Sequence, residues 1–217
     1  MTTNSYTKSR FTADNAALLL IDHQSGILQL VHDYSPAEYR NNVLGLAKLG
    51  KAFRLPTILT TSLDQGPNGP FIPEVLSMFP DAPLIRRQGI ISAWDDPEFL
   101  AAVEKTGRKN LIMAGVTVDV CLAFPAMQAV EAGYNVYGVV DASGGSDETL
   151  RDLAIARMQD HGVTPINWTT VGFELQRDWR LPTAQEFGPV VRDHYHSYSL
   201  LMDSFEAQTA NAARKAS

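Results

Sequence analysis

Strand-length apolar runs alternate along this chain with segments of helical periodicity, and this alternation constrains the fold more than any other feature. The runs expected to form strands cover residues 16–21, 56–61, 110–115, 135–140 and 164–168, and the helical segments between them cover 37–53, 97–106, 120–132 and 147–159. A β-α-β-α order is typical of a parallel sheet with helices on both faces. We therefore expect an α/β domain built on such a sheet.

The composition fits one domain of this kind. The chain has 217 residues, 45% of them hydrophobic, which is enough to bury a substantial core. The apolar runs fall far short of the roughly 20 residues that a membrane-spanning helix needs, and the first residues do not lead into an apolar secretory segment. The single cysteine, Cys121, fits a reducing compartment. We therefore expect a cytoplasmic protein without a membrane partner.

The net charge of the chain limits the class of partner. It is -6 at neutral pH, and the basic residues are scattered along the sequence. Proteins that bind nucleic acid through its phosphates usually carry a basic face. We therefore expect a small-molecule substrate and no nucleic-acid partner.

Two segments depart from the alternation. Residues 62–96 are rich in proline and glycine, and we interpret them as long loops near the functional face, with one short strand at 83–85. Residues 181–217 lack strand patterns but keep aromatic and apolar side chains, which a solvated tail does not need. We predict a main domain over 1–180 and a C-terminal helical arm over 181–217, packed on this domain or on a neighbouring subunit.

Cys121 lies where a predicted strand passes into a predicted helix. At such a position, the unpaired N–H groups and the positive end of the helix dipole favour a thiolate, which is the nucleophilic form of cysteine. The alternative is an inert cysteine that packs as a small hydrophobe. Position therefore favours a reactive thiol, whereas residue type alone favours a structural one.

Asp22 directly follows the first predicted strand. Open parallel sheets bind ligands at the carboxyl ends of their strands, near the point where the strand order reverses. If the strands that precede Asp22 and Cys121 are neighbours, the two side chains share a cleft, and the carboxylate can act as general base for the thiol. The alternative is that Asp22 caps the next helix.

Several short motifs together resemble the isochorismatase-like cysteine hydrolases, in particular their YcaC-like branch. They are the strand-end I-D-H-Q at 21–24, an arginine-containing loop before A-W-D-D-P at 93–97, and A-G-V-T at 114–117 ahead of Cys121. The resemblance extends over about residues 11–180. The combination is far more specific than any one of the motifs.

This resemblance implies a three-layer α/β/α sandwich with a six-stranded parallel sheet, a Rossmann-like arrangement. It also implies a catalytic triad of Asp22, Arg87 and Cys121, a cis peptide bond before Thr117, and an oxyanion hole formed by the backbone N–H groups of Thr117 and Cys121. The implied activity is hydrolysis of a small amide or related C–N bond through a covalent thioester. Members of the branch tend to form rings, so a homo-oligomer is expected.

The basic member of the triad departs from the pattern of most amidases in the superfamily, which have a lysine where this chain has Arg87. Arginine stays charged and does not shuttle a proton. Asp22 would then carry out every proton transfer, while Arg87 favours the thiolate and holds the carboxylate. The neighbouring Arg86 has the same chemistry, so the sequence leaves it open as the alternative.

The histidines do not form a metal-ligand pattern. Nicotinamidases of the superfamily carry Asp-x-His and a further histidine after the second strand, whereas this segment has none. The pair His194 and His196 lies in the polar arm, and a zinc site needs three or four ligands. We therefore expect no metal and no cofactor, and nicotinamidase activity is disfavoured.

Five further residues are weaker candidates for lining the cleft. They are Gln24, Thr61, Asn68, Phe71 and Trp94. The pair Asn68–Gly69 is also a good turn sequence, and Trp94 could instead anchor the core or a subunit interface. Asp141 also ends a strand, but the Ala-Ser-Gly after it favours a role in a turn.

Three other functions remain open at the level of sequence. Vinyl ether cleavage of the isochorismate type needs no cysteine nucleophile in this superfamily, so Cys121 argues against it. A non-catalytic or redox-responsive binding protein could use the same pocket and a thiol that cycles through sulfenic acid. A structural assembly with a vestigial pocket is the third alternative, because fold does not determine function.

Overall fold

The structure is a computed structural model that describes residues 10–216, with side chains as far as residue 211. It is built around a six-stranded parallel sheet with the order β3-β2-β1-β4-β5-β6. The strands are β1 (Ala16–Ile21), β2 (Thr57–Ser62), β3 (Leu84–Arg87), β4 (Asn110–Gly115), β5 (Asn135–Val139) and β6 (Thr164–Ile166). The predicted α/β class and six-stranded parallel sheet are confirmed.

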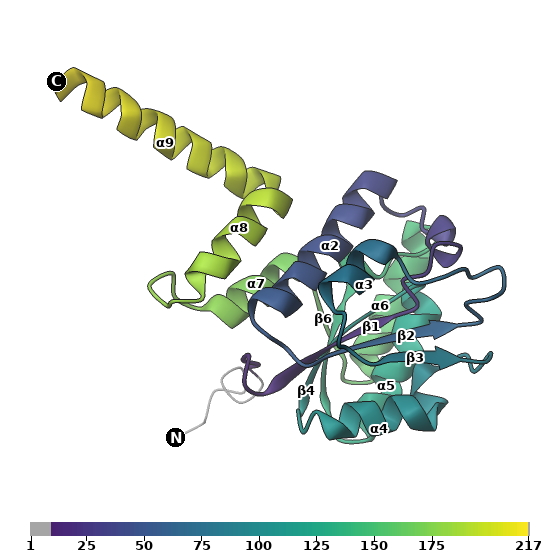
Figure 1. The fold of residues 1–217 in the computed structure, drawn as a ribbon. Coiled ribbons are helices and arrows are strands. Elements are labelled where there is room, and N and C mark those ends of the chain that lie inside the picture. Colours follow the sequence, from purple (N-terminus) through teal and green to yellow (C-terminus); the bar gives the residue numbers. More distant parts are fainter. Residues whose placement is uncertain (1–9, 217) are drawn as a thin grey trace.

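Helices cover both faces of the sheet and give the fold three layers (Figure 1). On one face lie α2 (Pro36–Ala52), α3 (Pro73–Met78), α7 (Trp168–Gln176) and α8 (Ala184–His194), and on the other α4 (Pro97–Lys105), α5 (Ala123–Glu131) and α6 (Glu148–Asp160). Because strand side chains alternate between faces, Leu18 and Leu20 of β1 pack in the first core. Leu19 and Ile21 pack in the second.

The order of the strands reverses around β1, which pairs with β2 on one side and with β4 on the other. All six residues of β1 are buried, as expected for a central strand covered on both faces. Ile21 at the end of β1 is in register with Gly115 at the end of β4. The residues that follow these two strands therefore emerge side by side.

Two predicted elements differ from the structure, one because it ends two residues early and the other because it is divided in two. The last strand is shorter than 164–168, because Asn167 caps α7 by accepting a hydrogen bond from the Thr170 N–H. The predicted helix 120–132 is divided into a π-helical turn, η3 (Val118–Leu122), and α5. The other predicted elements agree with the structure within one or two residues.

Two short helices fall outside the predicted set. α3 lies within residues 62–96, which the sequence indicates as loops and one strand, and Pro73 occupies its first turn, where a proline needs no N–H partner. α7 follows β6 with only the capping Asn167 between them. Three 3₁₀ turns complete the connections, η1 (Ile27–Leu30), η2 (Ala93–Asp95) and η4 (Val140–Ala142).

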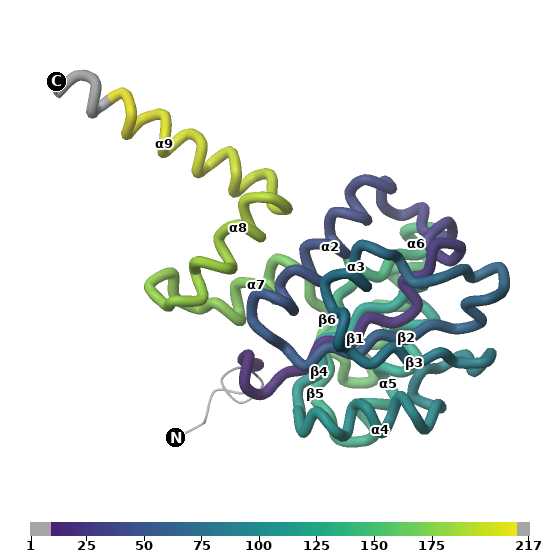
Figure 2. The backbone as a smooth tube through the Cα atoms, in the orientation of Figure 1, coloured from purple at the N-terminus to yellow at the C-terminus, as the bar shows by residue number. Residues whose placement is uncertain are grey.

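Residues 181–217 contain α8 and α9 (His196–Ala216). α8 packs on α2, and its apolar residues lie in the core under that face: Phe187, Val190 and Val191. α9 extends away from the body of the molecule (Figure 2), and Arg192 of α8 forms ion pairs with two acidic residues of α9. Across residues 10–216, no helix has both the length and the apolar character that a membrane span requires.

Candidate active site

Asp22, Arg87 and Cys121 meet at the carboxyl end of the sheet, where the strand order reverses. Asp22 follows β1, Arg87 is the last residue of β3, and Cys121 lies in η3, after β4. The guanidinium Nη2 of Arg87 donates a hydrogen bond to Oδ1 of Asp22, and both side chains are fully buried. The Cys121 thiol interacts with the same carboxylate and is itself partly exposed. The three residues singled out from the sequence thus form one contiguous cluster.

All three nitrogens of the Arg87 guanidinium donate hydrogen bonds. Nε donates to the Thr60 hydroxyl at 3.0 Å, and Nη1 donates to the carbonyl oxygens of Ile90 and Ile91 at 2.7 and 2.8 Å. Together with the bond to Asp22, these contacts link β2, β3 and the segment after β3 to the end of β1. Arg87 therefore fixes the carboxylate and the neighbouring loop at the same time.

Arg86 does not reach the cluster. It is the neighbour of Arg87 on β3, so its side chain points to the other face. Arg86 is exposed and pairs with Asp64, whereas Arg87 is 1% exposed and pairs with Asp22. Of the two neighbouring arginines, Arg87 is therefore the one that contacts Asp22.

The thiol of Cys121 is not poised as a thiolate. Burial, followed by the charge and hydrogen bond of Asp22, raises the pKa of Cys121, and Arg87 and the Thr117 N–H offset this only in part. Burial and the Asp22 carboxylate thus act against the thiolate expected at a helix start. Cys121 also lies in η3, ahead of the regular helix α5. The resting residue is a neutral thiol in contact with a carboxylate.

Asp22 has the properties of a proton acceptor for this thiol. Burial raises the pKa of its carboxyl group, and the interactions with Arg87 and Cys121 act in the opposite direction. Oδ1 accepts the hydrogen bond from Arg87. Oδ2 is buried, and among the described residues no donor lies in standard hydrogen-bond geometry to it. Oδ2 is therefore the oxygen available to take a proton from the sulfur.

The loop that carries Cys121 is held by close backbone packing. The peptide bond between Val116 and Thr117 is cis, and the Thr117 N–H faces the Cys121 sulfur. A Cβ atom at Gly115 would lie 2.6 Å from the Cys121 carbonyl oxygen, so only glycine fits there. The Val118 N–H donates to the Gly144 carbonyl at 2.8 Å. The loop after β5 thus supports the loop that carries the thiol.

Three polar residues that the sequence did not single out belong to this framework. Thr60 binds Arg87, and the Ser143 hydroxyl accepts from the Gly115 N–H at 3.2 Å. His23 is fully buried, its Nε2 lies 2.9 Å from the Ala142 carbonyl, and burial lowers its pKa to about 4. His23 is therefore neutral. Its position beside Asp22 is the one sequence signal that could have identified it.

Gln24 and Asn68 hold the loop after β2. The amide of Gln24 donates to the Ser62 and Gly69 carbonyls and accepts from the Ser62 N–H. The Asn68 amide donates to the same Ser62 carbonyl at 2.7 Å. Gln24 is fully buried. The polar atoms of Gln24 are committed to the backbone, so its role as a substrate contact stays a prediction without support from this geometry.

The other three weaker candidates are buried. Phe71 packs in the first core with its ring 5.9 Å from that of His23. Trp94 packs in the second core, edge-on to Tyr134 at 5.5 Å, which matches the core alternative for this residue. Thr61 is 1% exposed, and its hydroxyl has no hydrogen-bond partner among the described residues. The ring contacts of Phe71 and Trp94 are with His23, Phe99 and Tyr134, which lie outside the triad.

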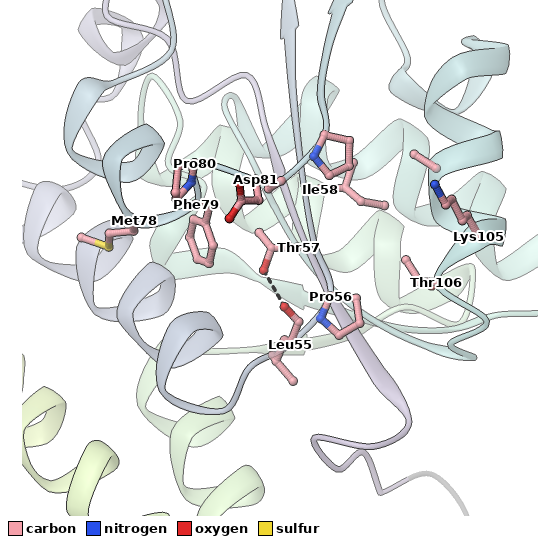
Figure 3. A pocket seen from close by; sticks show the side chains of 13 residues that line it. Leu55, Pro56, Thr57, Ile58, Met78, Phe79, Pro80, Asp81, Lys105 and Thr106 are labelled. Carbon is pink, nitrogen blue, oxygen red and sulfur yellow. Dashed lines mark hydrogen bonds between the residues drawn. The ribbon is translucent and has the colours of Figure 1, made fainter.

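A surface pocket of about 480 Å³ lies at the opposite end of the sheet (Figure 3). It is lined by residues that precede or begin β2, such as Pro56, and by Met78 and Lys105. None of the candidate site residues lines it. The pocket is therefore separate from the triad cluster.

The histidines and the acid at the end of β5 have structural contacts in this fold. No group of three or more histidine, cysteine, aspartate or glutamate side chains is arranged to hold a metal within residues 10–216. Nδ1 of His194 lies 2.9 Å from the Asn41 side-chain oxygen.

Asp141 accepts a hydrogen bond from the Trp168 N–H, and burial raises its pKa to about 7. Asp141 thus joins the end of β5 to the start of α7.

Comparisons with known proteins agree with this arrangement. The isochorismatase domain matches residues 16–170. The chain is 46% identical to the Escherichia coli protein named "Probable hydrolase YcaC" over 200 residues, which are 92% of this chain and 96% of that protein.

Two solved structures are also similar. YcaC from Pseudomonas aeruginosa, solved with hexane-2,5-diol and covalent acrylamide, is 49% identical with a TM-score of 0.90, covering 94% of this chain and 100% of that chain. The Escherichia coli YcaC structure, described as an octameric hydrolase of unknown specificity, is 47% identical with a TM-score of 0.90, covering 95% and 100%. The chain therefore belongs to the isochorismatase family of hydrolases, in its YcaC-like branch.

Proposed function

We propose that this protein cleaves a small amide or related C–N bond through a covalent thioester on Cys121. The observation that carries the proposal is the contact between the thiol of the single cysteine and a fully buried Asp22–Arg87 pair at the switch point of the sheet. Perturbed titratable groups in one buried cluster are typical of catalytic sites. Isochorismate-type vinyl ether cleavage gives no role to this thiol.

In the acylation half of the reaction, Oδ2 of Asp22 takes the thiol proton as the sulfur of Cys121 attacks the carbonyl carbon. The backbone N–H groups of Thr117 and Cys121 stabilise the oxyanion. Asp22 then donates its proton to the departing nitrogen as the C–N bond breaks. The products of this half are the free amine and a thioester on Cys121.

In the second half, water attacks the thioester while Asp22 takes one of its protons. The C–S bond breaks, the acid leaves, and the proton returns to the sulfur, so the resting thiol is restored. Arg87 stays charged throughout and reduces the repulsion between carboxylate and developing thiolate. Because the thiol is neutral at rest, the mechanism depends on Asp22 as base and not on a preformed thiolate.

A small amide is bound covalently in the Pseudomonas relative. That protein was solved with covalent acrylamide, a small primary amide whose C=C bond adds to thiols. This chain has one cysteine, so the corresponding adduct here would form on Cys121.

Replacing Cys121 with alanine is the direct test of the proposed function. We expect amide hydrolysis to be lost and the fold to be kept, because the change removes one partly exposed sulfur. The measurement is turnover across a panel of small amides, with circular dichroism to verify folding. Undiminished turnover by the pure variant would exclude the thioester scheme.

A non-catalytic, redox-responsive binding protein is the second candidate. The raised pKa of Cys121 favours a non-catalytic role, because a neutral thiol reacts slowly, but it argues against the redox response, since oxidation also needs thiolate character. The two functions differ in turnover. A protein that labels at Cys121 but releases no acid or amine from any amide would fit the binding function.

We further propose that α9 contacts a second copy of this chain. Three large apolar side chains of α9 are strongly exposed, Leu200, Leu201 and Phe205, and such patches mark interaction surfaces. The E. coli relative is an octamer, and this chain matches 100% of its chain. Ion pairs from Arg192 hold α9 in place without burying these residues.

The double variant Leu201→Ser with Phe205→Ser should form a smaller oligomer than the unmodified protein. Its mass is measured by sedimentation. The matched control is Leu153→Ser, because Leu153 is 67% exposed on α6. Truncation at residue 180 is a poorer test, since it also removes the core residues of α8. An unchanged mass for the folded double variant would remove α9 from the interface.

A further inference from the structure

The triad offers no free cation to a substrate. Four of the five N–H groups of Arg87 are bonded to Thr60, Ile90, Ile91 and Asp22, and the side chain is inaccessible. Among the described residues, Arg87 is the only buried lysine or arginine. A substrate carboxylate placed beside Cys121 would therefore lie next to the negative charge of Asp22 without a counter-ion, which is costly in a buried site.

Apolar side chains are exposed on two segments that are hydrogen-bonded to Arg87. Ile90 and Ile91, whose carbonyls bind Arg87, are 37% and 63% exposed. Leu63 is 48% exposed, and its N–H donates to the Arg87 carbonyl. A Cβ atom on Gly89 would lie 3.8 Å from the Leu63 side chain, so the two segments touch. We call Leu63, Ile90 and Ile91 the apolar rim.

The apolar rim is tied to the element that follows Cys121. The hydroxyl of Ser92, next to Ile91, lies 2.5 Å from the side-chain oxygen of Gln128 in α5. α5 begins two residues after Cys121. The segment that carries Ile90 and Ile91 is therefore hydrogen-bonded both to Arg87 and, through Ser92, to the helix that follows Cys121.

We infer that the substrate is an uncharged carbonyl compound whose carbonyl carries an apolar group. The apolar rim determines this preference. This inference rests on the proposed function. The rim residues contact the apolar group of the substrate. An anionic group is excluded, because the hydrogen bonds of Arg87 leave no cation to pair with it. This assigns a substrate class to the site and a specificity role to Leu63, Ile90 and Ile91.

A matched pair of thiol-directed probes tests the inference on the intact protein. One is N-butyl-2-iodoacetamide, and the other is the analogue whose chain ends in a carboxylate, N-(3-carboxypropyl)-2-iodoacetamide. Labelling of Cys121 is followed by mass spectrometry, and each rate is divided by the rate with glutathione. We expect the uncharged probe to be favoured ~10-fold or more, because burial of an unpaired charge and loss of apolar contact act together.

Variants of the apolar rim separate specificity from reactivity. Ile91→Lys should reverse or abolish the preference, because it adds a cation to the rim, and Leu63→Ser should weaken it. Leu181→Ser is the control, since Leu181 is 45% exposed at the start of the arm. The probe ratio of that control should equal the ratio of the unmodified protein.

The outcomes distinguish this inference from the function on which it rests. Equal normalised rates for the two probes, or a preference for the carboxylate, would overturn the substrate class while leaving Cys121 as a nucleophile. A preference unchanged by both rim variants would overturn the role of the rim. Absence of labelling by either probe would overturn the proposed function and the substrate class together.

Discussion

Asp22→Asn should lower the pKa of Cys121 and yet greatly reduce turnover. The carboxylate raises the pKa of the thiol by its charge and by its hydrogen bond, so its removal makes the thiolate easier to form. The same change removes the base that accepts the thiol proton and returns it to the leaving nitrogen. General-base catalysis contributes ~100- to 10,000-fold to rates, and we expect a loss of turnover in that range. Asparagine keeps the shape of the side chain and an oxygen for Arg87.

The measurement is the pH dependence of Cys121 alkylation by iodoacetamide, together with turnover on an amide that the unmodified protein hydrolyses. Asp64→Asn is the matched control, because Asp64 pairs with the exposed Arg86. It should leave both the pKa of Cys121 and turnover unchanged. A thiol that titrates identically with and without the Asp22 carboxylate would contradict the contact, and full turnover in Asp22→Asn would contradict its role as base.

The positions of Asp22 and Cys121 follow from sequence because they depend on long, regular elements. β1 and β4 are buried runs of six residues, and the order of elements along the chain makes the ends of such strands the expected binding edge. The six-stranded sheet and the family follow from the motifs at these same strand ends. Short elements such as α3 were missed, since six residues give little periodicity.

The electrostatic state of the site did not follow from sequence. A helix start beside Cys121 is visible in the sequence, but the distance of that thiol from a buried carboxylate is set by the loop packing around Gly115. Whether Thr60 or Thr61 binds Arg87 also depends on which face of β2 meets that arginine, and in the structure Thr60 does. Such details depend on three-dimensional contacts between segments far apart in the chain.

Arg87→Gln should destabilise the protein and raise the pKa of Cys121 further, the opposite of the shift expected for Asp22→Asn. Arg87 lowers the thiol pKa by its charge, so neutralising it removes that effect. The change also leaves the Asp22 carboxylate buried without its partner, and breaking a buried ion pair costs about 3–5 kcal/mol. The carbonyls of Ile90 and Ile91 lose their donor as well.

The experiment compares chemical denaturation and Cys121 alkylation for Arg87→Gln, Arg87→Lys and the control Arg86→Gln. Lysine keeps the charge but not the planar fork that binds Thr60, Asp22 and the loop carbonyls together, so it should restore the thiol pKa more than the stability. The double variant Asp22→Asn with Arg87→Gln should be more stable than Arg87→Gln alone, because no charge is then left unpaired. If Arg87→Gln were as stable as Arg86→Gln, the buried pair would not hold this end of the sheet, and the arginine would act on the thiol through its charge alone.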